Sequence, residues 1–144
     1  MGSVKRVGII GQGHVGAHVA NSLILQGIAD ELVLVDLLDK KLEAEVQDLT
    51  DSLSFAPHNV HIENGGAQYE ALADCDVVVN AAGHVSASAN GRDGELFVTS
   101  DEVPKFAQCI VKACFTVVWL STPNPCDFLA SATCHLTASA TNYI

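Results

Sequence analysis

The stretch "RVGIIGQGHVG" (residues 6–16) decides the fold, because it joins an apolar run to a helical pattern through a glycine-rich turn. The apolar run at 7–10 predicts a buried strand. Helical spacing over 14–26, with Gly27 following it, predicts a helix that ends at a glycine cap. The turn between them has the spacing G-x-G-x-x-G, and a strand before it and a helix after it are the context that a dinucleotide-binding turn requires.

Each glycine of this turn has a specific expected role. Gly11 allows the tight turn, Gly13 lets a pyrophosphate approach the backbone, and Gly16 lets the helix pack closely on the strand. The N–H groups at the start of the helix, at His14 and Val15, are expected to face the phosphates.

A second part of the fingerprint is an acidic residue about 20 positions further on, at the end of the second strand. Asp36 closes the apolar run "ELVLVD" at that place. Its carboxylate is suited to accept hydrogen bonds from the adenosine ribose, and its charge would repel the extra phosphate of NADP. The pattern therefore favours NAD as the cofactor. The alternative is a glycine turn with an unrelated surface aspartate.

The rest of the chain alternates between strand and helix patterns. Apolar runs predict further strands at 31–36, 76–83 and 115–121, with a weaker run at 59–64. Helical patterns fall at 39–54, 101–114 and 127–136. Parallel strands need crossover connections, so this alternation predicts an α/β fold of the Rossmann type, a doubly wound parallel sheet with about five strands.

Composition narrows the function classes. The 144 residues are 49% hydrophobic and 17% charged, which suits one globular domain without a membrane span. The formal charge of −10 would repel nucleic acid, so DNA and RNA are not expected partners. The N-terminus lacks the long apolar core of a signal peptide, which favours a cytoplasmic location.

Cysteine and histidine residues predict no disulfide framework and no metal site. The cysteines are odd in number and lack a C-x-x-C pair, so buried reduced thiols are expected at Cys75, Cys109, Cys114, Cys126 and Cys134. His14 and His18 have the i, i+4 spacing that can present two imidazoles to one metal ion. No third ligand accompanies them, and His14 lies where the cofactor pyrophosphate is expected, so we expect no metal there.

Three segments together resemble the family of L-lactate and malate dehydrogenases, and within it the L-2-hydroxyisocaproate dehydrogenases of lactic acid bacteria. "KRVGIIGQGHVGAHVANSLILQGIADELVLVD" (5–36) is similar to the family's opening strand, turn, helix and ribose-binding strand. "ALADCDVVVNAAG" (71–83) resembles its fourth strand and the turn that contacts the cofactor, and "NPCD" (124–127) resembles its Asn-Pro-Val-Asp motif.

The resemblance implies reversible hydride transfer between NAD and a 2-hydroxy or 2-oxo acid, in a protein that is a homo-oligomer when intact. It assigns Arg92 to polarising the substrate carbonyl and Asn124 to contacting substrate and the nicotinamide ribose. The remaining implied contacts are Gly11–Gly16 with pyrophosphate, Asp36 with the adenosine ribose, and Ala81, Ala82 and Gly83 along the path to nicotinamide. The alternatives are that Arg92 is an ordinary loop residue and that Asn124 only makes a turn before Pro125.

Ser86 departs from the family, which places a glutamine or an arginine there to select pyruvate or oxaloacetate. A serine brings neither a charge for a second carboxylate nor the bulk to exclude a large side chain. We therefore expect a 2-oxo acid with a longer apolar side chain. A malate-type enzyme and a non-catalytic, redox-sensing NAD-binding module are the alternatives.

The family also uses a sixth strand and a substrate domain, which carries the catalytic histidine. No histidine of the 144 residues matches that position. Reduction of a carbonyl needs a proton donor. We therefore expect 1–144 to be an NAD-binding domain truncated before the substrate domain, which binds NAD and does not turn over alone.

Overall fold

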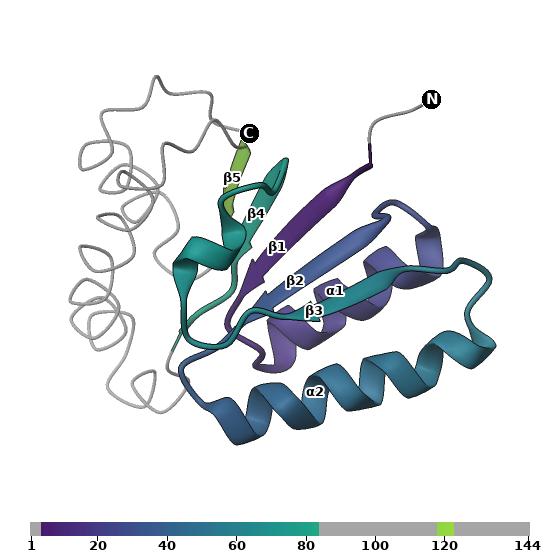
Figure 1. Cartoon of the computed structure of the whole chain (residues 1–144), viewed down its shortest axis with the longest axis horizontal. Coiled ribbons are helices and arrows are strands. Elements are labelled where there is room, and N and C mark those ends of the chain that lie inside the picture. The colour runs from purple at the N-terminus through teal and green to yellow at the C-terminus, as the bar shows by residue number, and fades with distance from the viewer. Residues whose placement is uncertain (1–3, 84–117, 123–144) are drawn as a thin grey trace.

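The computed structural model describes residues 4–83 and 118–122, which form strands, two α-helices and two short 3-10 helices (Figure 1). The helices expected at 101–114 and 127–136 lie outside these residues. In chain order the elements are β1 (Arg6–Ile10), α1 (His14–Gln26), β2 (Glu31–Val35), α2 (Asp39–Ser52), η1 (Leu53–Phe55), β3 (His61–Asn64), η2 (Tyr69–Leu72), β4 (Val77–Asn80) and β5 (Val118–Ser121).

The described strands form a parallel sheet in the order β3-β2-β1-β4-β5, which confirms the doubly wound fold. Chain order runs outward from β1 in one direction through β2 and β3, and in the other through β4 and β5. The sheet therefore has a topological switch point between β1 and β4, the place where ligands bind in such sheets. Ile10 pairs in register with Val35 on one side and with Asn80 on the other, so β1, β2 and β4 end together at one edge.

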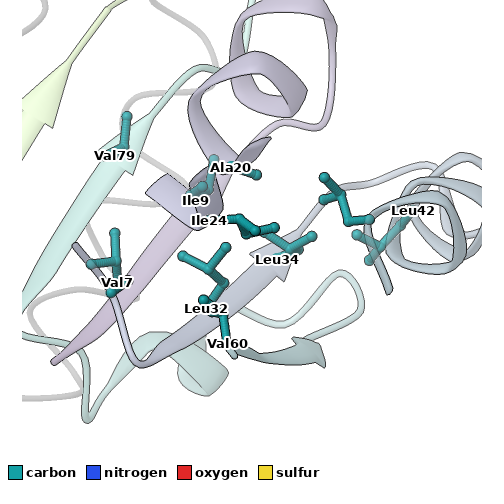
Figure 2. Close-up of a cluster of buried hydrophobic side chains, with 11 residues drawn as sticks. Val7, Ile9, Ala20, Ile24, Leu32, Leu34, Leu42, Val60 and Val79 are labelled. Carbon is teal, nitrogen blue, oxygen red and sulfur yellow. The ribbon is translucent and has the colours of Figure 1, made fainter. Parts of the chain in front are cut away.

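Side chains of alternating strand residues build a core on each face of the sheet. Leu32 and Leu34 of β2 are buried with Ile24 of α1 and Leu42 of α2, so α1 and α2 cover one face (Figure 2). Val33 and Val35 point to the other face, where they form a cluster with buried residues that include Leu72 of η2. Strands buried on both faces explain why the apolar runs lack alternation.

The observed ends of the helices and strands agree with the predicted ends where a local cap stops the element. They differ where a side-chain hydrogen bond turns the chain. Helix α1 has the predicted bounds, and Gly27 caps it with a left-handed φ of 62°. Strand β4 is shorter than the predicted run because Asn80 Oδ1 accepts a hydrogen bond from the Ala82 N–H at 3.2 Å, which turns the chain. The regular part of α2 ends at Ser52 and continues as the 3-10 turn η1.

Arg6 links the first three strands at the opposite edge of the sheet from the glycine turn. Its guanidinium lies 3.1 Å from the Glu31 carboxylate on β2 and 2.6 Å from that of Glu63 on β3. The neighbouring Cys75 is a buried free thiol, as predicted, and the other four cysteines lie outside the described residues. Burial raises the pKa of the Cys75 thiol, and the nearby Arg6 opposes this only in part, so the thiol stays protonated near neutral pH.

Among residues 4–83 and 118–122, neither α-helix combines the length and the apolar character needed to cross a membrane.

Candidate functional site

The turn after β1 lies in direct backbone contact with the turn after β4. Gly11 has a left-handed φ of 84°. A Cβ placed on Gly11 would lie 2.7 Å from both Cα and N of Ala82. Both the φ angle and the contact distance therefore restrict this position to glycine. The predicted pyrophosphate turn and the predicted nicotinamide-side turn, at Ala81 and Ala82, are thus neighbours in space.

The first turn of helix α1 also lies in direct contact with the backbone that follows β1. A Cβ on Gly16 would overlap the carbonyl oxygen of Gly11, and it would lie 3.5 Å from Cγ2 of Ile9. The first turn of α1 can pack here only because residue 16 has no side chain. This confirms the close helix-to-strand packing that the third glycine predicts.

The N-terminus of α1 is arranged to receive an anion. Gly13 is the N-cap, no side chain caps the helix, and the first turn contains no acidic residue. The N–H groups of this turn therefore carry partial positive charge without a capping side chain to neutralise it. His14 and Val15 are exposed on the same turn. Space is open beside Gly13: within 4 Å, a Cβ there would meet only the Lys41 Nζ, at 3.9 Å.

Lys41 is a candidate site residue that the sequence analysis did not identify. It lies in the first turn of α2, is exposed, and forms no ion pair with any described residue, while its ammonium group reaches the Gly13 turn. The sequence contains two adjacent lysines, Lys40 and Lys41, and only their positions on the helix distinguish them. The position of Lys41 brings an ammonium group to the turn where phosphates are expected.

Asp36 lies at the predicted place, at the end of β2 beside the glycine turn. Its Oδ2 accepts a hydrogen bond from the Gln12 N–H at 2.6 Å, and its Oδ1 accepts one from the Leu38 N–H at 2.9 Å. The half-buried carboxylate is thus fixed in orientation. Each oxygen keeps a further lone pair, so the group can also accept hydrogen bonds from a ligand hydroxyl.

Residues after β4 complete this edge of the sheet. Ala81 and Ala82 are half-buried and Gly83 is exposed. Asn80 is buried, and its carbonyl accepts hydrogen bonds from both N–H and Oγ1 of Thr122, each at 3.0 Å, which ties β4 to the end of β5. Ser86, Arg92 and Asn124 lie outside the described residues, so their positions relative to this edge stay predictions.

The geometry therefore provides backbone donors, an ammonium group and an oriented carboxylate around one turn. This set fits the phosphates and a ribose of a dinucleotide. Side chains at positions 11 and 16 would collide with backbone, whereas the space beside Gly13 stays open. Within the part of the chain that the structure describes, no group of three or more potential metal ligands is present.

Comparisons with known proteins agree with this geometry. The family model for the lactate/malate dehydrogenase NAD-binding domain matches residues 5–144. The L-lactate dehydrogenase of Fusobacterium nucleatum is 38% identical over 125 residues, covering 87% of this chain and 38% of the relative. L-lactate dehydrogenase 2 of Enterococcus faecalis is 36% identical over 125 residues, covering 87% of this chain and 39% of the relative.

A solved structure extends the agreement to the fold. The minor L-lactate dehydrogenase of Enterococcus mundtii matches with a TM-score of 0.87 at 27% identity, over 96% of this chain and 44% of that chain. The chain thus spans about two-fifths of the length of the curated relatives that it matches.

The close approach at Gly16 predicts a large loss of stability on Gly16→Ala. The added methyl group collides with backbone rather than with a movable side chain, so we expect a loss of about 1–3 kcal/mol or more in the free energy of unfolding. Urea denaturation followed by circular dichroism measures it. The matched control is Gly13→Ala, where a methyl group meets no close neighbour and only the N-cap preference changes, at a cost below about 1 kcal/mol. Equal stability of the two variants would contradict the packing described above.

Proposed function

The chain belongs to the lactate/malate dehydrogenase family, in which it is an NAD-binding domain, and from this we propose that residues 1–144 act as one domain of an NAD-dependent L-2-hydroxyacid dehydrogenase. The observation that carries the proposal is the meeting of three segments at one edge of the sheet: the glycine turn, Asp36 and the turn at Ala82. Together they offer the contacts that a dinucleotide needs, at the switch point of the sheet.

The residues that would hold NAD fall into groups according to the part of the cofactor that they contact. The N–H groups at the start of α1 and the Lys41 ammonium bind the phosphates, and the fixed Asp36 carboxylate accepts hydrogen bonds from the adenosine ribose. The side chains of Ala81 and Ala82 are small and Gly83 has none, so this turn leaves room for the part of NAD that leads to the nicotinamide. Bound NAD supplies the site that accepts or gives the hydride.

The substrate side of the proposal rests on residues known from the sequence. Arg92 polarises the substrate carbonyl, and Asn124 contacts the substrate and the nicotinamide ribose. Ser86 favours a 2-oxo acid with a bulky apolar side chain, since it offers no charge for a second carboxylate. We further propose that the whole enzyme is a cytoplasmic homo-oligomer, and that nucleic acid and membranes are not among its partners.

Binding of NAD and NADP by the chain tests the assignment of Asp36. We expect NAD to bind at least about tenfold more tightly than NADP, a difference of about 1.4 kcal/mol, because the carboxylate repels a 2′-phosphate. In Asp36→Ser this difference should shrink, while Asp48→Ser, which removes an exposed carboxylate from the middle of α2, should keep it. Isothermal titration calorimetry gives all the affinities. Equal affinities of the unaltered chain for the two cofactors would refute the role of Asp36, and binding of neither would refute the proposed function.

Lys41 and Lys40 form a matched pair for testing the phosphate contact. Lys41→Ala should weaken NAD binding about threefold to tenfold, within the range for a partly solvated charge-assisted contact. Lys40→Ala removes the same charge from the same helix and should leave the affinity within twofold, about 0.4 kcal/mol. The same calorimetric titration measures both. If the two variants lose affinity equally, Lys41 makes no specific phosphate contact and contributes only to the electrostatic potential of the whole molecule.

Substrate preference is tested on the protein in which this domain occurs. NADH oxidation should be faster, as kcat/KM, with 2-oxoisocaproate than with pyruvate or oxaloacetate, because Ser86 leaves room for a large side chain. A preference for oxaloacetate would contradict the role of Ser86 and indicate the malate-type alternative. Binding of NADH without turnover of any of the three acids would favour the non-catalytic module.

A further inference from the structure

His14 and His18 form an exposed imidazole pair whose side chains have no role in the proposed cofactor site. They lie one turn apart on α1, with their ring centroids 6.4 Å apart and their planes inclined by 51°. Both side chains are exposed. They line the same surface hollow, of about 540 Å³, with Val15, Val19, Ser22 and Leu23.

A hydrogen bond prepares one ring of this pair for metal binding. His18 Nδ1 lies 2.6 Å from the carbonyl oxygen of His14. A carbonyl oxygen only accepts, so Nδ1 donates its hydrogen, and in the neutral ring Nε2 keeps a free lone pair. Histidines that bind metals are commonly oriented in this way, with the second ring nitrogen donating to a carbonyl or a carboxylate.

We propose that His14 and His18 together chelate an exchangeable divalent transition metal ion, with water completing its coordination. The i, i+4 spacing on one helix is the spacing with which paired histidines bind zinc in helical metal sites. Because both side chains are exposed, a change of rotamer at His14 can turn its ring toward the free Nε2 of His18. Imidazole suits zinc, copper and nickel, and the ordinary order of affinity places Cu²⁺ above Ni²⁺ and Zn²⁺.

The proposal replaces the expectation, from the sequence, that no metal binds here. That expectation rested on the lack of a third ligand and on the position of His14, where the cofactor pyrophosphate is expected. A two-histidine site is weaker than the resident sites with three or four protein ligands. The net charge of −10 draws cations to the molecule, whereas the N-terminus of α1 opposes them. The bound ion would lie beside the first turn of α1, so metal and cofactor would be close neighbours.

Titration of the 144-residue chain with Ni²⁺, and separately with Cu²⁺ in buffer without reductant, tests the site. His14→Ala/His18→Ala should lower the affinity of one site at least tenfold. The control His58→Ala/His61→Ala, which removes two other exposed histidines, should bind as the unaltered chain does. Cu²⁺ should bind more tightly than Ni²⁺, and electron paramagnetic resonance of the Cu²⁺ form should show two nitrogen ligands that the double variant loses.

The proposal is overturned if the first double variant and the unaltered chain give the same Ni²⁺ isotherm. Should the substitution at residue 14 disturb the glycine turn, as judged by circular dichroism, the single variant His18→Ala decides the question, since residue 18 lies in the second turn of the helix. Unchanged Ni²⁺ affinity in that variant equally refutes chelation. Neither outcome depends on whether the chain binds NAD.

Discussion

The structure depends on a backbone-to-backbone approach at the edge of the sheet where β1 ends. Gly11 lies against the backbone of Ala82, and Gly16 lies against the carbonyl of Gly11. These contacts set how closely α1 packs on β1 and how near the turn after β4 lies to the turn after β1. Side chains cannot adjust such contacts, because the atoms involved belong to the main chain. The arrangement of the candidate site therefore follows from the absence of two Cβ atoms.

Electrostatics then explains how an acidic molecule can receive an anionic ligand. The chain carries a formal charge of −10, yet the turn at Gly13 is surrounded by helix N–H groups and the Lys41 ammonium. The acidic group beside this turn, Asp36, accepts hydrogen bonds from the N–H groups of Gln12 and Leu38. Fixed donors close to a phosphate outweigh distant charges, which salt screens over about 10 Å. A local field can thus oppose the sign of the whole molecule.

The sequence predicted those parts of the fold that local chemistry controls. The bounds of α1 and its cap at Gly27 follow from periodicity and from glycine, and Asp36 follows from its distance to the turn. The position of Lys41 over Gly13 depends instead on how α2 packs, which spacing does not encode. The end of β4 depends on a hydrogen bond of the Asn80 side chain, and η2 is too short to give a helical period. Gln12 is buried in the turn, where its Nε2 donates to the Ile9 carbonyl, although glutamine is usually exposed.

When a phosphate is bound by backbone N–H groups, the side chains of the turn can vary without loss of those contacts. The N–H groups at the start of α1 serve a phosphate whatever residue follows Gly13, provided that its side chain points away from the turn. His14 satisfies this condition, because it is exposed on the outer side of α1 and shares a hollow with His18 rather than with Asp36. A histidine at this position therefore leaves all the backbone N–H donors of the dinucleotide turn in place. The outer face of the helix can acquire a separate chemistry while the inner face keeps the packing that Gly16 requires.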